Sequence, residues 1–368
     1  MRIAYVLTSL GVGGAERQAV TLAERMAARG HAVSLIVLNG RQPHEWPTTL
    51  ELARLNMRKT PASIMAGLVK ARRFLRVFQP DLIHSHTYPA NMAARLLKIA
   101  FPAAAVLSTV HSVYDGPWPR MLAYRLTDFL SRHTTTVSAA GAARYVRLKA
   151  VPAHKCTVVT NGIDTVEFVP SPDRRACLRA QMVMNREFVW LAVGRIVTAK
   201  DHPNLLRAFS RVHADSPMAR LWVAGEAPAA GLAAVQALAV ELGVEASVRW
   251  LGLRRDIPAL LDAADAFVSA SAWEGMPLAV GEAMAMEKPV VVTDVGGVRE
   301  LVGERGVIVP AKAPEALAQA MLALMRETPQ ARNIMGRAAR ERIDGEFTID
   351  TRAEEWESLY RTMLLRSR

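Results

Sequence analysis

Two glutamates, Glu274 and Glu282, stand eight positions apart around a Gly-x-Pro turn, and this spacing is the clearest chemical pattern in the chain. The short apolar run 266–271 before them is typical of a buried strand, whereas residues 279–287 have helical composition. The segment therefore predicts a strand, a tight loop and a helix. Pro277 suits the first turn of that helix, where its missing N–H costs nothing.

The loop between this strand and helix is predicted to bind a phosphate or a sugar hydroxyl. The backbone N–H groups of Gly275, Met276 and Leu278 would face outward, with the positive end of the helix dipole behind them. Glu274 lies at the strand end, where open α/β sheets place their ligand residues. Glu282 follows one turn into the helix and is placed to accept hydrogen bonds from a diol such as a ribose. The alternative is a capped helix whose glutamates are solvated.

Further candidates follow other strand-like runs. Arg195 and Lys200 come just after the apolar run 188–193, where a planar guanidinium and an ammonium could grip a diphosphate. His111 ends the run 106–110 at its carboxyl edge. Exposed cations are common, so Arg195 and Lys200 are weak candidates in isolation. A lone histidine is more often structural, and His111 is a candidate because of its position at a strand end.

The stretch 11–17 follows the first strand-like run and opens a helix. It fails as a dinucleotide fingerprint, because Glu16 holds the third glycine position. Gly13 and Gly14 would still let a ligand approach the backbone, and a helix N-terminus favours an anion. A purely structural tight turn explains the glycines equally well.

His84 and His86 are two positions apart on a predicted strand, so their side chains share a face. Metal binding is conceivable, but no third ligand is apparent in the sequence. Ordinary packing or hydrogen bonding is the favoured interpretation.

The net charge is concentrated in the first half of the chain. Residues 1–165 carry 21 Lys and Arg against 8 Asp and Glu, a net +13, whereas residues 166–368 carry 25 against 26, a net −1. A basic half favours a membrane surface, nucleic acid or an anionic substrate as partner. Nucleic acid ranks low, because no zinc-finger spacing or aromatic RNA-binding motif is present.

The densest basic stretch is 54–76, with apolar residues between its cations. It predicts an amphipathic surface helix whose basic face is either solvated or rests on anionic lipid headgroups, at about 1 kcal/mol per basic residue. The residues expected to contact the membrane or an anionic acceptor are Arg72, Arg73 and Arg76.

The bulk properties indicate a cytoplasmic protein of two domains. A chain of 368 residues exceeds one typical domain. No apolar run reaches the ~18 residues of a membrane helix, and no signal peptide precedes the first strand-like run. Cys156 and Cys177 lack metal-ligand or redox spacing, which fits a reducing compartment.

Apolar runs alternate with helical segments along the chain, which predicts mostly parallel sheets with helices on both faces. Residues 170–173 are predicted to be a linker. The expected strands are 2–8, 32–38, 81–85, 104–110, 134–138 and 156–160 in the first half, and 188–193, 220–224, 247–251, 266–270, 289–293 and 306–309 in the second. The expected helices of the first half are 14–29, 61–79, 88–100 and 118–132.

These motifs together resemble the retaining, nucleotide-sugar-dependent glycosyltransferases of family 4, also called group 1. The resemblance covers nearly the whole chain and rests on Glu-x7-Glu at 274–282, Gly-Gly-Ala-Glu-Arg at 13–17, Thr-Val-His at 109–111, Asn-Gly-Ile-Asp at 161–164, Gly-Arg-x4-Lys at 194–200, and Gly296-Gly297 with Glu300. One departure is Ala227, which replaces the second glycine of a Gly-x-Gly-Pro loop and puts details of nucleotide packing in doubt.

The resemblance implies the α/β GT-B fold, in which two Rossmann-like domains face each other across a cleft. The N-terminal domain, 1–168, would bind the acceptor, and the C-terminal domain, 169–347, would bind the nucleotide sugar. A helix over 348–368 would cross back to the first domain.

The implied reaction transfers a sugar, with retention at the anomeric carbon, from a UDP- or GDP-linked co-substrate and without a metal or other cofactor. No Asp-x-Asp metal motif appears in the sequence. The expected acceptor is a saccharide, and the basic first domain favours one that is linked to a lipid. The expected role is in the assembly of lipopolysaccharide, another cell-surface polysaccharide or a glycolipid. The enzyme would then act in the cytoplasm, peripherally on the inner face of an anionic membrane.

The resemblance also implies the roles of individual residues. His111 and Glu274 would be catalytic: His111 would contact the donor sugar near the reacting centre, and Glu274 would orient its hydroxyls. The expected donor-binding set is Gly13, Gly14, Arg195, Lys200, Gly275, Met276, Pro277, Leu278 and Glu282.

Three alternatives share parts of this pattern. A GT-B nucleotide-sugar epimerase has the fold but not the Glu-x7-Glu loop. A phosphorylase needs a phosphate acceptor and usually a cofactor-bound lysine, for which no motif is visible. A non-catalytic sugar-binding GT-B protein would have lost Glu274, Arg195 or Lys200, and all three are present.

Overall fold

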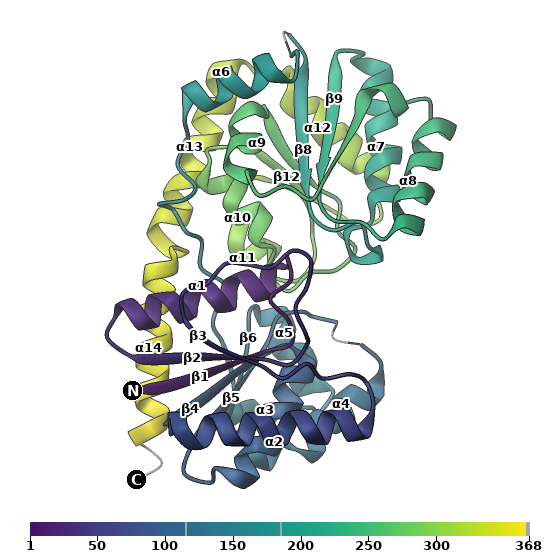
Figure 1. Cartoon of the computed structure of the whole chain (residues 1–368). Helices are drawn as coiled ribbons and strands as arrows, with labels where there is room; N and C mark the ends of the chain where they lie inside the picture. Colours follow the sequence, from purple (N-terminus) through teal and green to yellow (C-terminus); the bar gives the residue numbers. More distant parts are fainter. Residues whose placement is uncertain (115, 185, 366–368) are drawn as a thin grey trace. The chain divides into compact units, whose positions relative to one another are not determined.

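The computed structural model describes residues 1–114, 116–184 and 186–365 and forms two compact units (Figure 1). The first unit is Met1–Gly162 together with the chain from Ile349, and the second is Ile163–Thr348. Residues 366–368 of the expected C-terminal helix lie outside the described residues. Within the described part of the chain, no helix is long and apolar enough to cross a membrane.

The first unit is built on a seven-stranded sheet in the order β3-β2-β1-β4-β5-β6-β7, and all its strand pairs are parallel. From β1, the chain first adds β2 and β3 on one side of the sheet and then β4 to β7 on the other, as in a Rossmann fold. β3 was not predicted, because this edge strand is exposed to half-buried and no apolar run marks it. The strands are β1 (Arg2–Leu7), β2 (Ala32–Val37), β3 (Glu51–Arg54), β4 (Leu82–His86), β5 (Ala105–Val110), β6 (His133–Thr136) and β7 (Cys156–Val158).

Helices cover both faces of this sheet. They are α1 (Gly14–Ala28), α2 (Pro61–Phe78), α3 (Tyr88–Ala100), α4 (Trp118–Leu126), α5 (Ala139–Arg147) and α14 (Ile349–Leu365), with short 3-10 turns η1 (Asp128–Leu130) and η2 (Ala153–Lys155). The helix expected to reach residue 132 ends at Leu126 instead. The buried Arg95 donates a 2.8 Å hydrogen bond to the Tyr124 carbonyl, which a continuing helix would offer to the N–H of residue 128.

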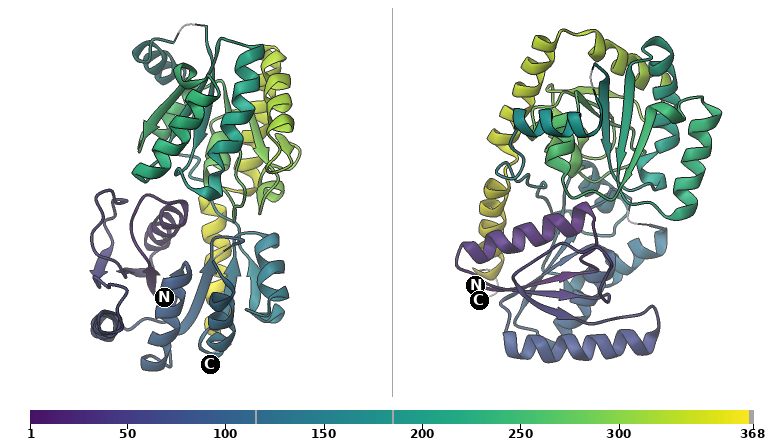
Figure 2. Two further views of the ribbon diagram at one scale, coloured as in Figure 1. Left: turned by 90° about the vertical axis from the view of Figure 1, so that its right-hand side faces the viewer. Right: turned by 45° about the horizontal axis from the view of Figure 1, so that its top comes forward.

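The first sheet separates two hydrophobic clusters through the alternation of its side chains. Ala4 and Val6 of β1 face the cluster that contains α2 and α3 residues, whereas Ile3 and Tyr5 face the cluster that contains α1 and α14 residues. α1 and α14 pack against each other on that second face (Figure 2). The last helix of the chain is therefore part of the first unit's core.

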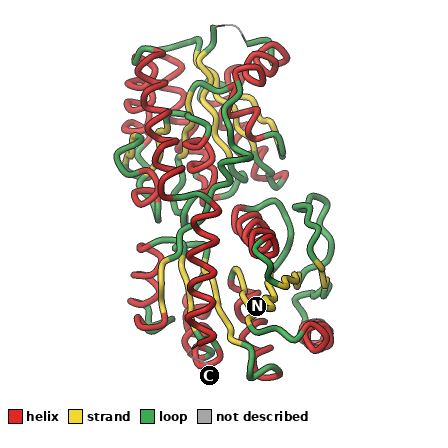
Figure 3. Tube along the Cα trace, turned by 90° about the vertical axis from the view of Figure 1, so that its left-hand side faces the viewer, coloured by secondary structure: helices red, strands yellow, loops and turns green. Residues whose placement is uncertain are grey.

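The second unit has a six-stranded parallel sheet in the order β10-β9-β8-β11-β12-β13, again enclosed by helices (Figure 3). The predicted fold class, two Rossmann-like α/β units, is confirmed. The strands are β8 (Phe188–Val193), β9 (Ala219–Ala224), β10 (Val248–Gly252), β11 (Ala266–Ser269), β12 (Val290–Thr293) and β13 (Val307–Val309). The helices are α6 (Pro172–Gln181), α7 (His202–Asp215), α8 (Ala229–Glu241), α9 (Ile257–Ala263), α10 (Leu278–Ala285), α11 (Val298–Val302), α12 (Pro314–Arg326) and α13 (Pro329–Glu346), with 3-10 turns η3 (Thr198–Lys200) and η4 (Glu245–Ser247).

The linker predicted over 170–173 is wrong, because its second half begins a helix. The Ser171 hydroxyl caps α6 by accepting a hydrogen bond from the Arg174 N–H, and Pro172 occupies the first helical position. Serine at the cap and proline at the first helical position are the signals of a helix start.

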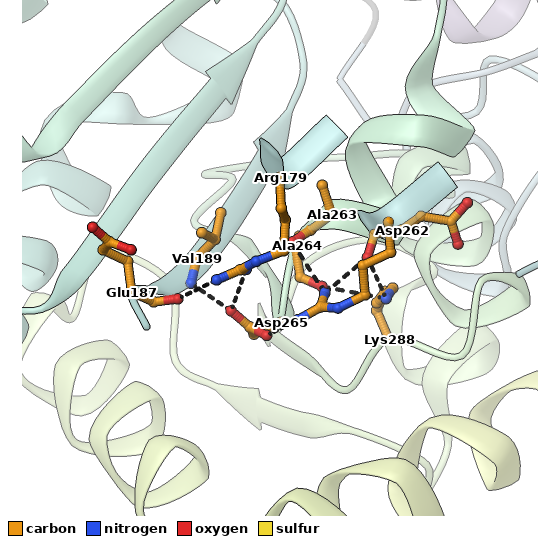
Figure 4. A network of polar contacts seen from close by, with 9 residues as sticks. Arg179, Glu187, Val189, Asp262, Ala263, Ala264, Asp265 and Lys288 are labelled. Atoms are coloured by element: carbon orange, nitrogen blue, oxygen red, sulfur yellow. Dashed lines mark hydrogen bonds and ion pairs between the residues drawn. The ribbon is translucent and has the colours of Figure 1, made fainter. Parts of the chain in front are cut away.

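Arginines of α6 bind the end of α9 and the start of β11. Arg175 Nη1 donates to the carbonyls of Asp262, Ala263 and Ala264 at 2.8–3.0 Å, and its Nη2 pairs with Asp265 at 2.6 Å. These carbonyls are the unpaired last groups of α9, so a cation there satisfies them and complements the helix dipole. Arg179 also pairs with Asp265, whose carboxylate accepts the Val189 N–H (Figure 4).

Lys288 approaches the same carbonyls. Its Nζ donates to Asp262 and Ala264 at 3.2 Å each (Figure 4). Burial, and then the charge of Arg175, lower the pKa of Lys288 to about 8. The network thereby fixes the start of β11, and the half-buried Lys288 ammonium within it loses its proton easily.

We expect the free energy of unfolding to rise with pH through the titration of Lys288. Below about pH 8 the lysine is charged in both states; from about pH 8 to about pH 10 the unfolded chain keeps the proton that the native chain has lost, and stability increases by about 2 kcal/mol. Urea unfolding across this pH range measures the change in the free energy of unfolding. Lys288→Met should remove the rise and the exposed-site control Lys312→Met should keep it; an unchanged pH profile in Lys288→Met would contradict the assignment.

Candidate functional site

The predicted loop follows the carboxyl end of β11. Pro277 is the N-cap of α10 rather than a residue of its first turn, so the helix starts at Leu278, one residue before the predicted range. Among the described residues, the N–H groups of Gly275 and Leu278 have no hydrogen-bond acceptor. Met276 is buried, so its side chain anchors the loop. These amides remain available to an anion at the helix N-terminus.

Lys200 and Glu274 meet at the ends of neighbouring strands. Lys200 Nζ donates to Glu274 Oε1 at 2.6 Å, and Ser271 Oγ donates to the same oxygen at 2.7 Å. The pair is only partly exposed, with 25% of the lysine and 14% of the glutamate side chain accessible. A Cβ on Gly194 would lie 2.9 Å from the Lys200 Cε, so this glycine leaves room for the lysine stem. Ser271 was missed in the sequence, where nothing distinguishes it from other strand-end serines.

A glycine turn after β12 supports the same loop. The Gly297 N–H donates to the Gly275 carbonyl at 2.6 Å. Gly296 has φ +55°, and a Cβ there would lie 2.3 Å from the Glu274 carbonyl oxygen. A side chain at position 296 is therefore excluded both by its backbone conformation and by this contact. The turn fixes the backbone that presents Glu274.

The remaining candidate residues of the second unit differ in their exposure. Arg195 follows β8, is exposed, and has no side-chain hydrogen bond within the described part of the chain. Glu282 is buried in the second turn of α10. A Cβ on Gly225 would lie 2.0 Å from the Gly194 carbonyl oxygen, so the loops after β8 and β9 touch through their backbones.

In the first unit, Gly13 and Gly14 stand at the start of α1, after the carboxyl end of β1. Gly13 is the N-cap, and a Cβ there would lie 2.3 Å from Glu16 Oε2. Glu16 also accepts a hydrogen bond from Ser9 Oγ at 3.2 Å. The space left by Gly13 is thus filled by a carboxylate of the same helix, whose negative charge is favourable near the helix N-terminus.

His111, after β5, belongs to a cluster of aromatic rings. Its Nε2 lies 2.9 Å from Nδ1 of His86, whose ring is 4.1 Å from that of His84. Burial lowers the pKa of His111 to about 4 and holds the pKa of His84 and His86 well below the usual value. All three imidazoles are therefore neutral at pH 7.

His84 is held from two sides. Its Nδ1 lies 2.7 Å from the hydroxyl of Tyr360 in α14, and its Nε2 lies 2.7 Å from Thr109 Oγ1. The prediction that His84 and His86 serve packing and hydrogen bonding is confirmed. In the described residues, no group of three or more His, Cys, Asp or Glu side chains is arranged to hold a metal ion.

The basic stretch 54–76 is helical only from Pro61, in agreement with the expected helix 61–79. Arg54 ends β3 and pairs with Glu45, and α2 begins only at Pro61. The three arginines Arg72, Arg73 and Arg76 are exposed on α2. They lie in its C-terminal half, which leads towards the amino end of β4, so the structure does not bring them together with Gly13 and His111 at the carboxyl edge of the sheet.

The second-unit cluster has the groups needed to bind a phosphorylated, hydroxylated ligand. A lysine supplies positive charge, two backbone amides supply directed donors, and a carboxylate supplies an acceptor for hydroxyl groups. All of them follow the carboxyl ends of the adjacent strands β8 and β11, where parallel α/β sheets bind ligands.

Comparison with known families and proteins agrees with this chemistry. The family description "Glycosyltransferase Family 4" matches residues 12–167, and "Glycosyl transferases group 1" matches residues 187–327. The chain is 32% identical to the alpha-maltose-1-phosphate synthase of Mycolicibacterium smegmatis over 76% of this chain and 78% of the relative. It is 24% identical to an Escherichia coli UDP-Gal:alpha-D-GlcNAc-diphosphoundecaprenol alpha-1,3-galactosyltransferase, over 82% and 80% of the two chains.

Solved structures share the fold over the whole chain. Anabaena HepE, in complex with UDP and glucose, has a TM-score of 0.86 at 21% identity and covers 98% of this chain and 99% of its own. The sucrose-phosphate synthase of Thermosynechococcus elongatus has a TM-score of 0.87 at 20% identity, with full coverage of both chains. The strand-end cluster, the two parallel sheets and the family matches lead to one conclusion: the chain belongs to glycosyltransferase family 4, group 1, with the GT-B fold.

Proposed function

We propose that this GT-B glycosyltransferase is a retaining, metal-independent enzyme that moves a hexose from a UDP- or GDP-linked donor to a saccharide acceptor. The observation that carries the proposal is the Lys200–Glu274 pair beside the free amides of Gly275 and Leu278. It joins a diphosphate-binding cation and a hydroxyl-binding carboxylate at one sheet edge. The HepE structures contain UDP, glucose or UDP-glucose, which supports a uridine nucleotide as the first donor to try.

The donor roles follow from the geometry of each group. In the ligand-free pair, Glu274 and Lys200 satisfy each other. On binding, the donor's diphosphate takes Lys200, with Arg195 and the loop amides of Gly275 and Leu278 as further donors, and the sugar hydroxyls take Glu274. Glu282 is assigned to the ribose, and His111 to the sugar near its reacting carbon.

The reaction needs no protein nucleophile in this scheme. As the glycosidic bond breaks, negative charge grows on the leaving diphosphate, and fixed donors stabilise it where it develops. The acceptor hydroxyl attacks the anomeric carbon from the face that the diphosphate leaves, and its proton passes to a departing phosphate oxygen. The product keeps the configuration of the donor sugar.

The acceptor is assigned to the basic first unit. The E. coli relative is named for a diphosphoundecaprenol-linked acceptor, which supports a lipid-linked saccharide here. Such an acceptor fits an enzyme of cell-surface polysaccharide, lipopolysaccharide or glycolipid assembly that works peripherally on the cytoplasmic face of a membrane. The net +13 of residues 1–165 supports contact with an anionic surface.

The first experiment tests transfer, retention and metal independence together. A thermal-shift screen of nucleotide sugars selects the donor, since a ligand at 100 times its Kd stabilises by about 2.7 kcal/mol. Transfer in excess EDTA is then followed by NMR of the anomeric proton, and we expect activity to persist with a retained configuration. Loss of activity restored by Mn²⁺, or an inverted product, would contradict the scheme. Epimerised donor without transfer would identify an epimerase.

The second experiment tests the diphosphate contact. Lys200→Ala should lower kcat/KM by two to three powers of ten, since removal of one preorganised donor costs about 3 kcal/mol. The melting temperature should change little, because Glu274 remains partly accessible to water and keeps its hydrogen bond from Ser271. Arg207→Ala removes an exposed cation from α7 and serves as the control with unchanged kinetics. Wild-type turnover in Lys200→Ala would exclude the lysine from the donor site.

The third experiment tests membrane contact through α2. Beside Arg72, Arg73 and Arg76 this helix exposes apolar side chains, namely Met65 (60%), Val69 (47%) and Val77 (84%). Basic and apolar residues together are typical of helices that lie at a bilayer surface. We expect the wild-type protein to sediment with anionic vesicles at low salt and to be released at about 1 M salt, where the screening length is about 3 Å.

Charge reversal localises that contact. Arg72, Arg73 and Arg76 changed to Glu should abolish sedimentation while leaving donor binding intact. The matched control changes Arg207, Arg305 and Arg337 of the second unit to Glu, with the same change of net charge. Equal loss in both triple variants would point to net charge alone, and no sedimentation of the wild type would assign the basic surface to a soluble anionic acceptor.

A further inference from the structure

Ser271 has no role in the reaction proposed above, yet its hydroxyl contacts the carboxylate that is assigned to the donor sugar. The side chain is 1% exposed and follows β11. Its Oγ donates to Glu274 Oε1 at 2.7 Å, the same oxygen that accepts from Lys200 Nζ at 2.6 Å. Glu274 Oε2 has no hydrogen-bond partner among the described residues, and 14% of the glutamate side chain is accessible. The two donors therefore occupy one carboxylate oxygen and leave the other for a ligand.

A second serine orients the Ser271 hydroxyl. Ser269 Oγ lies 3.2 Å from Ser271 Oγ, and the distance alone allows either hydroxyl to donate. A hydroxyl has one proton and an ion-paired carboxylate only accepts, so the Ser271 proton is committed to Glu274. Ser269 must then donate to Ser271. Hydrogen bonds that run in one direction polarise one another, which strengthens the contact to the carboxylate.

The backbone at Ser271 is held from two further sides. Its carbonyl accepts a 2.7 Å hydrogen bond from Oγ1 of the buried Thr293, at the end of β12. The N–H of the next residue, Ala272, donates to the Ala199 carbonyl at 2.8 Å, in the 3-10 turn that ends with Lys200. Ser271 is therefore connected to the chain after β8 and to β12, the two strands that flank β11.

The two donors to Glu274 respond differently to a phosphorylated ligand. Lys200 is charged and 25% accessible, so a diphosphate that binds it competes with the carboxylate. Ser271 is neutral and enclosed, so its hydrogen bond is not exposed to the same competition. Once Lys200 has turned to the diphosphate, Ser271 is the donor to Glu274 Oε1 that remains among the described residues.

We propose that Ser271 is a positioning residue whose hydroxyl keeps Glu274 Oε1 in place when Lys200 turns to the diphosphate, so that Oε2 faces the hydroxyls of the donor sugar. Ser269 supports this by orienting the hydroxyl. The hydrogen bond belongs to the second unit without any ligand, whereas the use of Oε2 rests on the proposed function. Without the serine, the released carboxylate would spread over several rotamers, and a sugar would have to order it again on binding.

Crystal structures of ligand-free variants test the hydrogen bond itself. Lys200→Ala imitates the loss of the lysine to a diphosphate, and in this variant Glu274 should keep its place with Oε1 on Ser271. When Ser271→Ala is added to Lys200→Ala, the carboxylate should leave that place or occupy more than one rotamer. A Glu274 that turns away from Ser271 in the single variant, or that stays in place in the double variant, would overturn the proposal.

Calorimetry with UDP and UDP-glucose measures what the fixed carboxylate does. Ser271→Ala should weaken UDP-glucose binding about tenfold, in line with loss of a hydrogen bond to a charged group. UDP binding should be unchanged, because UDP has no sugar to contact Glu274. Ser271→Cys keeps the volume with a much weaker donor, so it should lose nearly as much as Ser271→Ala. Ser247→Ala removes another buried serine hydroxyl, before the amino end of β10, and is the control with unchanged binding.

A double-mutant cycle decides whether Ser271 acts through Glu274. In a Glu274→Ala background, Ser271→Ala should have no further effect on UDP-glucose binding, whereas a serine with a separate structural role would cost about tenfold again. Additive losses in the cycle, or equal weakening of UDP and UDP-glucose in Ser271→Ala, would overturn the positioning role. If the wild type binds neither compound, the donor class of the proposed function is wrong, while the crystal structures still decide whether Ser271 holds Glu274.

Discussion

Two backbones meet without side chains between them at the carboxyl edge of the second sheet, and the proposed donor site depends on this contact. Gly296 lies directly on the Glu274 carbonyl and Gly297 donates to the carbonyl of Gly275. The contact orients the loop so that Glu274 reaches Lys200 and the amides at the start of α10 stay unpaired. A larger residue at position 296 would separate the loops after β11 and β12 and remove this arrangement.

The opposite end of β11 is held by charge instead. Arg175 and Lys288 bind the last carbonyls of α9, just before the strand begins. Partial burial of Lys288 among these carbonyls is costly, as its lowered pKa shows. The strand is therefore fixed at its base by a polar network and at its tip by close backbone packing. Such fixed support is what preorganised electrostatic catalysis requires, because donors that must reorganise stabilise the transition state less.

Apolar runs in the sequence predicted the strands well wherever the strands are buried. The apolar runs gave every strand of the second sheet to within a residue or two, because both faces of a parallel strand are covered. They missed β3, which is exposed at a sheet edge, and they could not foresee that Arg95 ends α4 early. The linker at 170–173 was misjudged because proline and serine signal a helix start as well as a loop.

The candidate site was predictable in its residue types but not in its pairings. The motif spacing indicated Lys200 and Glu274 separately, whereas their ion pair and the Ser271 hydrogen bond depend on the order of β8 and β11 in the sheet. His86 was assigned to packing, since nothing in the sequence places it against His111. A crystal structure with UDP-glucose tests the central claim most directly. The account predicts that the diphosphate separates Lys200 from Glu274 and accepts hydrogen bonds from Lys200 and the Gly275 and Leu278 amides; a donor bound elsewhere, with the Lys200–Glu274 pair intact, would contradict it.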